Sequence, residues 1–426
     1  MIDKSVRKGL ICSILILFVS ISSMPLAGSL SFEKQKLVNK FSITTNPVFS
    51  RGETFYKTFG GYEGDSGNCV QQTSDDGYII VGYKGDCIWL IKTDSAGNKE
   101  WNTTLDTTPS PFNYDYYVGT YVQQTNDGGY IISGYFYFDR FHYHLFLLYK
   151  TDSTGNIQWY QVFERSMEDL AYCVQQTNDY GYIIVGQSDL YGAEKDDVWL
   201  IKTNGNGYEQ WDKTFHRNND DHGYYVQQTT DYGYIIVGET GGIDDNDIDI
   251  WLIKTDSDGN MLWDRTFGGT DIDSGRCVQQ TSDEGYIITG TKDGYICLIK
   301  TDSAGNIVWD NPLEAGTGNY VQQTSDGGYI ITGEGWLIKT DSAGNIIWKK
   351  TFPYDALGLC VRQTTDGGYI ITGNVEKIFF NPDVCLIKTD ENGKARNKIS
   401  TNSLFLRFLE RFPNVFQILK YVLGGR

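Results

Sequence analysis

Apolar residues along this chain come in short runs separated by polar turns, and four runs make one period. The first run is Val-Gln-Gln-Thr, as at 70–73, and the second is Gly-Tyr-Ile-Ile with a small residue and Gly, as at 77–82. The third is Trp-Leu-Ile-Lys-Thr, as at 89–93, and the fourth starts with Trp and ends in Lys-Thr-Phe, as at 211–215. Short runs rich in Val, Ile, Tyr and Trp favour strands over helices.

The turns between these runs predict antiparallel hairpins. Asp-x-Gly-Tyr separates the first and second runs, as at 75–78 and 366–369. Asp can bond its own backbone two residues further on, and we expect the Gly of this turn to take a positive φ. Asp-Ser-Ala-Gly-Asn does the same between the third and fourth runs.

Seven copies of this period follow one another. Their first runs begin at Val70, Val122, Val174, Val226, Val278, Val321 and Val361. These valines are 52 residues apart four times, and then 43 and 40 residues apart. Four antiparallel strands at such a period are one blade of a β-propeller. The sequence therefore predicts an all-β fold, a seven-bladed β-propeller of four-stranded antiparallel blades.

The ends of the repeat region predict how the ring closes. The seventh copy lacks its fourth run and has Asn397 at the Trp position, whereas a matching run precedes the first copy, with Phe55 at that position. We predict that residues 55–59 pair as an outer strand with residues 385–389. The alternative is a blade phase that starts at Phe55, which uses the same strands without a shared blade.

These limits divide the chain into a signal peptide (1–29), a linker (30–54), the propeller (55–397) and a C-terminal tail (398–426). The signal peptide is predicted from Lys4, Arg7 and Lys8, which precede an apolar run at 10–21 and then small residues. We therefore expect a secreted or cell-surface protein.

The tail is apolar and basic, and its spacing predicts a short amphipathic helix that Pro413 kinks or divides. The apolar residues at helical spacing are Leu404, Phe405, Phe408, Phe412, Phe416 and Leu419. Docking to a membrane surface, docking to a partner and packing onto the propeller are the alternatives for this helix.

The chain resembles secreted bacterial and archaeal propeller repeat proteins. Their repeats read W-x-K-T-F-G-G, then D-G-G-Y-I-I-x-G, then W-L-I-K-T-D-x-x-G-N, and the resemblance covers Phe55 to about Lys394. The G-x-x-x-W spacing is also similar to the tryptophan-docking repeat of quinoprotein propellers, which implies that each Trp packs between blades. The resemblance implies the fold and leaves the function open.

The paired glutamines of the first run have two interpretations. Neighbouring residues of a strand point to opposite faces, so each glutamine would meet a different neighbouring blade near the channel. A structural ring that caps the innermost strands and sets the blade register is favoured, because the pair is repeated in every blade except at Arg362. A channel-lining site for a small polar ligand is the alternative.

The charge and the cysteines narrow the choice of partner and compartment. The net charge is −18, and the ends of the chain are basic, so the propeller region is even more acidic than the whole. Such a surface repels nucleic acid. The cysteines after the signal stand mostly where other copies have Tyr or Trp, so we expect buried packing residues rather than a disulfide framework.

Two long loops that flank the second blade, which we expect to be neighbours, carry the candidate ligand site. Aromatic side chains with an acid or a base beside them suit a glycan or a peptide, although they could also form a small core that holds long loops. The residues of this site are Tyr114, Tyr116, Tyr117, Tyr135, Tyr137, Phe138, Arg140 and Phe141.

A possible calcium site is formed by the carboxylates Asp244, Asp245, Asp247 and Asp249. The stretch lacks the calcium-loop pattern, so a solvated acidic loop is the favoured interpretation. Apart from calcium, we expect no cofactor.

We expect a binding or scaffold module whose partner is a protein or a glycan at the cell surface. Common hydrolase, metalloprotease and phosphate-loop motifs are absent from the sequence. The alternative is a carbohydrate-active hydrolase or lyase with its site in the central pocket of the face that carries the variable loops, which join the blades and the second strands to the third. A sialidase-like pocket would need clustered arginines, and the candidates are Arg140, Arg165, Arg217 and Arg276.

Overall fold

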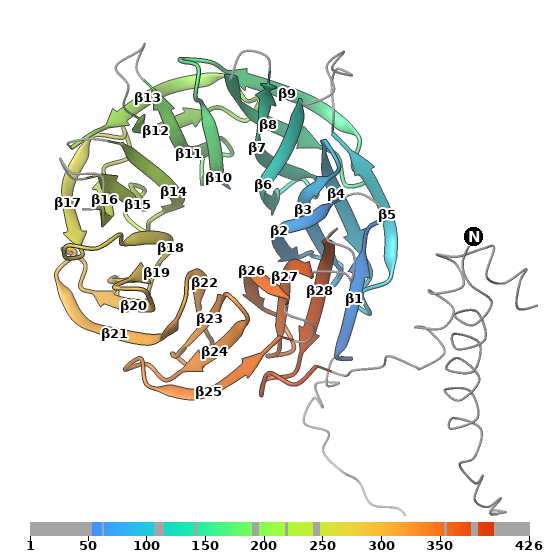
Figure 1. Cartoon of the computed structure of the whole chain (residues 1–426). Helices are drawn as coiled ribbons and strands as arrows, with labels where there is room; N and C mark the ends of the chain where they lie inside the picture. Colours follow the sequence, from blue (N-terminus) through green and yellow to red (C-terminus); the bar gives the residue numbers. More distant parts are fainter. Residues whose placement is uncertain are drawn as a thin grey trace, which may run out of the picture. The chain divides into compact units, whose positions relative to one another are not determined.

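The computed structural model describes residues 53–61, 64–105, 115–139, 143–189, 196–217, 220–241, 248–352, 356–375 and 382–395. These residues form strands β1 to β28, which make seven four-stranded antiparallel sheets arranged as blades around a central channel (Figure 1). The predicted seven-bladed propeller is confirmed. The signal peptide, nearly all of the linker and the tail lie outside the described residues. Within the described residues, no helix is long and apolar enough to cross a membrane.

The strands take the order that the repeat predicts. The innermost strands are β2 (Asp65–Gln72), β6 (Tyr116–Gln124), β10 (Leu170–Gln176), β14 (Asp221–Gln228), β18 (Ser274–Gln280), β22 (Gly318–Gln323) and β26 (Leu357–Gln363). The second strands are β3 (Tyr78–Lys84), β7 (Tyr130–Phe138), β11 (Tyr182–Asp189), β15 (Tyr234–Gly241), β19 (Tyr286–Lys292), β23 (Tyr329–Gly333) and β27 (Tyr369–Val375). We number the blades one to seven in this order.

The third strands are β4 (Cys87–Thr93), β8 (Tyr143–Thr151), β12 (Asp196–Thr203), β16 (Ile248–Thr255), β20 (Tyr295–Thr301), β24 (Trp336–Thr340) and β28 (Asp383–Thr389). The outer strands are β5 (Lys99–Thr104), β9 (Ile157–Phe163), β13 (Glu209–Phe215), β17 (Met261–Phe267), β21 (Ile307–Ala315), β25 (Ile346–Thr351) and β1 (Phe55–Phe59). The second and third strands form most of the core, because neighbouring blades cover both of their faces.

Ring closure follows the shared-blade prediction. Strand β1 pairs antiparallel with β28, so blade seven has the order β1-β28-β27-β26. The register joins Phe55 to Lys388 and Phe59 to Val384, one residue away from the predicted register. The alternative phase, in which Phe55 starts a blade of its own, is therefore wrong.

The aromatic residue of each outer strand packs on the next blade, as the resemblance to tryptophan-docking repeats implies. The ring of Trp159 in blade two lies 5.8 Å from that of Tyr182 in blade three, at 60°. Its six-membered ring also covers the turn glycine Gly207, where an added Cβ would come within 2.5 Å of it. At the outer edge of each joint between blades, one aromatic side chain therefore packs on the next blade.

In the first hairpin turn, the residue with the left-handed conformation is not the predicted one. In the turn of blade one the positive φ belongs to Asp76, at 64°, and not to the following Gly77. Gly77 is needed for another reason: an added Cβ would lie 2.2 Å from the carbonyl oxygen of Thr93. In the second turn the prediction is correct, since Gly97 has a φ of 73°.

A buried lysine from the third strand holds each first hairpin. Lys92 is 3% exposed, and its Nζ lies 2.9 Å from Asp75 and donates to the carbonyl of Thr93 at 2.9 Å. The same ion pair recurs at 2.8–3.0 Å in every blade. Its lysines are Lys92, Lys150, Lys202, Lys254, Lys300, Lys339 and Lys388. Each of these cations is paired and hydrogen-bonded, as a buried charge requires.

Candidate binding sites around the central channel

The first glutamine of the repeat ties each blade to the next. Gln175 of β10 accepts a hydrogen bond at Oε1 from the backbone N–H of Gln228 in β14, at 2.6 Å. Six joints have this bond at 2.6–2.7 Å, through Gln71, Gln123, Gln175, Gln227, Gln279 and Gln322. The inner edge of an innermost strand has no strand beside it, so its N–H groups need such partners.

The second glutamine makes the bond in the opposite direction. Gln228 accepts at Oε1 from the backbone N–H of Asn178 in the preceding blade, at 2.9 Å. All seven joints have this bond at 2.8–2.9 Å, through Gln72, Gln124, Gln176, Gln228, Gln280, Gln323 and Gln363. The structural interpretation of the glutamines as a ring that joins the blades is therefore confirmed.

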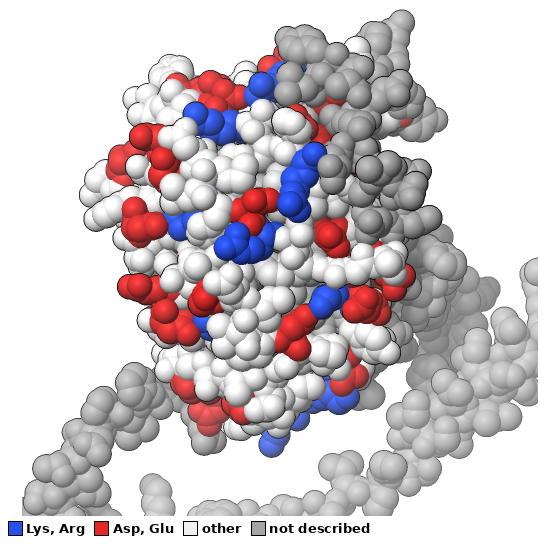
Figure 2. Space-filling view, turned by 90° about the vertical axis from the view of Figure 1, so that its left-hand side faces the viewer, with Lys and Arg blue, Asp and Glu red and all other residues white. Residues whose placement is uncertain are grey.

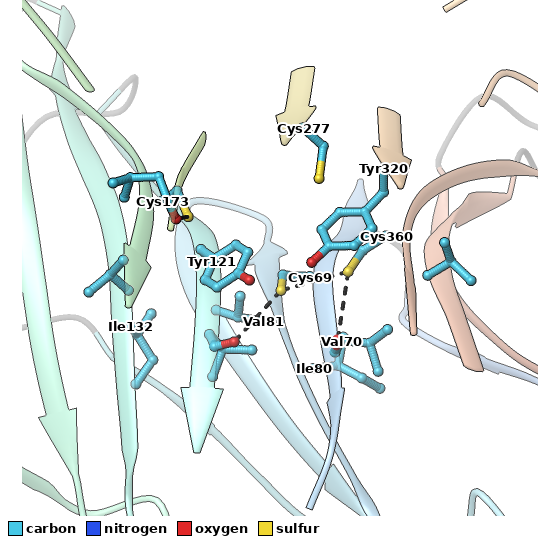
Figure 3. Packing of buried hydrophobic residues seen from close by; sticks show 14 of the residues in the cluster. Cys69, Val70, Ile80, Val81, Tyr121, Ile132, Cys173, Cys277, Tyr320 and Cys360 are labelled. Carbon is cyan, nitrogen blue, oxygen red and sulfur yellow. Dashed lines mark hydrogen bonds between the residues drawn. The ribbon is translucent and has the colours of Figure 1, made fainter. Parts of the chain in front are cut away.

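Cysteine and tyrosine alternate around the channel one residue before the motif valine (Figure 3). The residues are Cys69, Tyr121, Cys173, Tyr225, Cys277, Tyr320 and Cys360. Each cysteine Sγ lies 3.5–3.7 Å from a valine carbonyl of the next blade. All of the cysteines that the structure describes are free thiols. These observations support their prediction as packing residues.

The three tyrosines of this level meet in the middle of the channel. The hydroxyl of Tyr225 lies 3.0 Å from that of Tyr121 and 2.9 Å from that of Tyr320. Both neighbouring rings approach the Tyr225 ring edge-on, with centroids 5.8 Å apart. Because cysteine is small, the alternation leaves room for three large rings, which narrow the channel at this level.

Arg362 stands at the first-glutamine position of blade seven and reaches this cluster. Its guanidinium carbon lies 4.6 Å from the ring centroid of Tyr320, and its Nη2 donates to the hydroxyl of Tyr121. Its Nε is buried and has no hydrogen-bond partner among the described residues. A guanidinium has no acceptor, so Arg362 cannot repeat the bond that glutamine makes at the other six joints.

These side chains line a cavity of about 310 Å³. The lining residues are Gln71, Gln72, Tyr121, Gln123, Gln175, Tyr225, Val226, Gln227, Gln279, Tyr320, Val321, Gln322, Arg362 and Gln363. Arg362 is the one charged residue in this described lining. The channel therefore presents glutamine amides and one cation, in a protein whose net charge is −18.

A β-bulge occurs at the same place in every innermost strand and carries a residue that varies between blades. The bulged residues are Asn68, Thr120, Tyr172, Tyr224, Arg276, Asn319 and Leu359. Bulges often re-aim side chains beside functional sites. Tyr172 and Tyr224 meet edge-on at 5.1 Å, and the Arg276 guanidinium lies 4.3 Å from the Tyr224 ring centroid.

His222 is the centre of a polar network beside these rings. Its Nδ1 lies 2.9 Å from Glu239 and its Nε2 3.2 Å from Asp196, while the hydroxyl of Tyr224 donates to Glu239 at 2.6 Å. Burial lowers the pKa of His222, but hydrogen bonds to Asp196 and Glu239 outweigh it and raise this pKa to about 9. The imidazole is therefore charged at neutral pH and has both nitrogens occupied.

The sequence did not single out this network, because its members come from blades three, four and five and lie far apart along the chain. Of the four arginines considered for a sialidase-like pocket, Arg276 is part of it. Arg165 and Arg217 instead pair with Asp212 and Asp264, and Arg140 lies outside the described residues.

The predicted aromatic site lies on extended strands of blade two. Tyr116 and Tyr117 belong to β6, and Tyr135, Tyr137 and Phe138 belong to β7; Tyr114, Arg140 and Phe141 lie outside the described residues. The expectation of loops is therefore wrong for the described part, where β6, β7 and β8 each run for 9 residues. The two stretches are neighbours, as expected.

The aromatic residues of this extension pack on both faces of the sheet. On one face Tyr137 lies 5.0 Å from Tyr116 and 4.7 Å from His144, ring to ring. On the other face Tyr117 is 7% exposed and lies 4.3 Å from Phe136. The first face therefore gathers tyrosine and histidine rings, and the second face is mostly apolar.

An open depression of about 510 Å³ lies on the apolar face. Its lining residues are Phe136, Phe138, Tyr143, Leu145, Glu164 and Met167. Met167 is 65% exposed, so its side chain faces solvent at the edge of the depression. The depression thus combines aromatic and aliphatic walls with one carboxylate.

Of the predicted calcium ligands, Asp249 is in β16, opposite Thr240 of β15; Asp244, Asp245 and Asp247 lie outside the described residues. Within the described residues, no group of three or more His, Cys, Asp or Glu side chains could hold a metal ion. Calcium binding by this stretch stays a prediction.

The outer side of the ring carries charges of both signs. Figure 2 shows acidic and basic side chains interspersed on the side that carries β17. Arg217 and Asp264 are one pair on this side, with 3.4 Å between Nε and the carboxylate. Exposed pairs of this kind contribute little stability.

Comparison with known proteins supports the fold. No protein-family model and no curated protein matches the chain. A streptogramin B lyase structure has a TM-score of 0.52 at 10% identity, covering 80% of this chain and 99% of that one. The Dos1 propeller has 0.50 at 11% identity, covering 82% and 98%.

Raptor from Chaetomium thermophilum has a TM-score of 0.52 at 6% identity, covering 90% of this chain and 36% of that one. At these identities the likeness concerns the fold alone, and propellers with this fold have many functions. The chain is a seven-bladed β-propeller of four-stranded blades.

Proposed function

We propose that the chain is a secreted or cell-surface binding module that uses blade two to hold a partner protein. The observation that carries this proposal is the apolar depression beside the extended strands, with Met167 exposed at its edge. A monomer seldom exposes a contiguous apolar patch without a use. Secretion is supported by the basic and apolar pattern at the start of the sequence.

The lining favours a protein partner over a glycan. A sugar site needs several polar groups that converge beside an aromatic platform, whereas Phe136, Phe138 and Leu145 provide none. Glu164 is the one charged residue among the described lining residues. We therefore expect the partner segment to insert an apolar side chain and to carry a Lys or Arg beside it.

The test is a displayed peptide library and a glycan array, each probed with the wild type, Met167→Ala and Phe138→Ala. Peptides that combine an apolar and a basic residue should be enriched, and each substitution should weaken their binding by about 1–3 kcal/mol. Leu262→Ala is the matched control, because Leu262 is 58% exposed on another blade. Binding to glycans alone, or equal loss with the control, would contradict the proposal.

An enzyme is the second candidate, and the His222 network is the observation that favours it. Paired carboxylates and an arginine on three neighbouring blades could serve a hydrolase or lyase, in line with the propeller fold of streptogramin B lyase. The engagement of both imidazole nitrogens argues against His222 as a general base, which needs a free nitrogen. A hydrolase and lyase screen with His222→Gln as the control tests this candidate.

A further inference from the structure

The orientation of the first glutamines is fixed by their partners. Each of the six accepts a hydrogen bond from a backbone N–H, so the atom at that position must be the amide oxygen. The amide nitrogen, a pure donor, is therefore the end left for the cavity that these residues line. Within the described residues, no protein acceptor contacts these amide nitrogens.

Arg362 completes this circle of donors. It occupies the seventh first-glutamine position, lines the same cavity and brings a charge instead of an amide. Its buried Nε has no partner among the described residues, and its other described contacts are tyrosine and cysteine groups. A partly buried cation without an opposite charge beside it is costly, so the cavity favours an anion beside this guanidinium.

We propose that the channel binds a small free oxyanion, a carboxylate or a phosphate, between Arg362 and the glutamine amides. A volume of about 310 Å³ is at the lower end of ligand pockets and fits an anion with a few oxygens. Donors on all sides match an anion with acceptors on several sides. The described lining contains no carboxylate that would repel it.

The neighbouring tyrosines are suited to this ligand as well. The hydroxyls of Tyr121, Tyr225 and Tyr320 bond to one another, so one proton of the chain can point into the cavity. Tyrosine is neutral at physiological pH and donates without adding negative charge. The anion would thus meet neutral donors around a single fixed cation.

Arg362→Gln is the decisive variant, because glutamine is the residue of the other six blades. The substituted side chain can accept from the backbone N–H of Gln72, as Gln175 accepts from Gln228. We therefore expect this variant to fold and to melt at or above the wild-type temperature in the absence of anions. It removes the charge and keeps the ring, so loss of binding cannot be ascribed to unfolding.

Calorimetric titration and thermal melting with citrate, phosphate, chloride and neutral glycerol test the proposal on the full chain. Citrate or phosphate should bind the wild type and raise its melting temperature by roughly 2–4 °C, and Arg362→Gln should weaken this binding at least about tenfold. Arg362→Lys, which keeps the charge without the planar fork, should lie between them.

Four results would overturn the proposal. The first is no citrate or phosphate binding by the wild type, and the second is equal binding by Arg362→Gln. The third is a glycerol effect as large as that of citrate, which would mean that the cavity recognises neutral polar groups. Binding of chloride with no preference for oxyanions would overturn the assignment of the ligand class.

Discussion

The residue before the invariant glycine of the first hairpin turn has a left-handed conformation in every blade. Four of these residues are not glycine, and their φ values are 64–67°. They are Asp76, Tyr180, Tyr232 and Glu284. An L-residue in this conformation costs roughly 1–2 kcal/mol. Tyr232 is 60% exposed, so burial of its side chain offsets little of this cost.

We predict that Tyr232→Gly stabilises the protein by about 1 kcal/mol, because glycine adopts a positive φ without strain. Gly233→Ala in the same turn should destabilise it by more than that, since its Cβ would lie 2.2 Å from the carbonyl oxygen of Thr255. Urea unfolding of both variants measures this. A loss of stability in Tyr232→Gly would contradict the assignment of the strained residue.

The turn also shows where the sequence is ambiguous at the residue scale. Several copies have two successive glycines, as at Gly327 and Gly328, so the sequence identifies the turn without showing which glycine is left-handed. Steric crowding of Gly328 by the third strand depends on tertiary packing. The sequence carries no local signal for that contact.

His222 gives a pH prediction at the same scale. Its pKa, raised to about 9, means that its network contributes full stability below the unfolded value near 6.5 and loses it as the pH rises through 9. His222→Asn should be less stable than the wild type at pH 7, and the difference should shrink towards pH 10. NMR titration of the imidazole measures the pKa directly. A midpoint near 6.5 would contradict the two-carboxylate geometry.

At the scale of the blade, the first hairpin and the third strand depend on one another through a buried ion pair. Lys92 belongs to β4, and its partner Asp75 belongs to the turn between β2 and β3. The pair therefore fixes three strands at one point. The sequence shows both residues in every repeat, but only the folded blade brings them together.

This ion pair predicts sensitivity to acid. Burial raises the pKa of Asp75, but hydrogen bonds from Thr73 and Lys92 outweigh it and lower this pKa to about 2. A depressed carboxylate pKa gives stability that is complete above the unfolded value near 4 and is lost as the pH falls towards 2. The urea midpoint should therefore fall between pH 4 and pH 2.

The control for this prediction uses the same ion pair in the last blade. Asp366→Asn should lower the stability at pH 7, and its stability should depend less on pH between 4 and 2 than that of the wild type. The buried carboxylates Asp65, Asp221 and Asp273 have raised pKa values, chiefly through burial. Their protonation favours the folded state as the pH falls, so it opposes the loss of stability from the ion pairs. A wild-type midpoint that stays constant over this range would contradict the prediction.

The sequence pattern of blade two does not show how far its strands extend. The stretch from Tyr135 to Phe138 is aromatic throughout, so no alternation of polar and apolar residues marks it as a strand. The structure extends β7 through it because β6 and β8 are equally long and pair with it on both sides. Rings then pack on both faces, where the sequence predicted loops.

At the scale of the whole molecule, the number of blades shapes the channel. Cysteine and tyrosine alternate around the ring, and because seven is an odd number, two neighbouring blades must carry the same residue. These are blades one and seven, where Cys69 and Cys360 lie side by side with 3.8 Å between their Sγ atoms. The joint between blades one and seven also contains Arg362 and is closed by β1. The ring is therefore asymmetric at the point where the chain closes it.

Most of this architecture could be predicted because seven in-phase copies repeat the same strand signals. The channel site could not, because the hydrogen bond to the neighbouring strand determines which amide atom of each glutamine faces the cavity, and the sequence does not show that bond. The exception at Arg362 is visible in the sequence. Its position against Tyr320 and Tyr121 follows from the closed ring alone.

The closing joint gives the last prediction. Phe55 in β1 is 8% exposed, and its ring lies 6.1 Å from Tyr78 of blade one, as Trp159 lies near Tyr182 at an internal joint. Phe55→Ala should lower the free energy of unfolding of the whole ring by about 3–5 kcal/mol, because the blades support one another only when every joint is packed. Phe55→Trp, which gives the residue of the other outer strands, should change it by less than about 1.5 kcal/mol. Urea unfolding followed by tryptophan fluorescence measures both variants, with Trp159→Ala as the matched change. If Phe55→Ala unfolds at the wild-type midpoint while Trp159→Ala does not, β1 is not needed to close the ring.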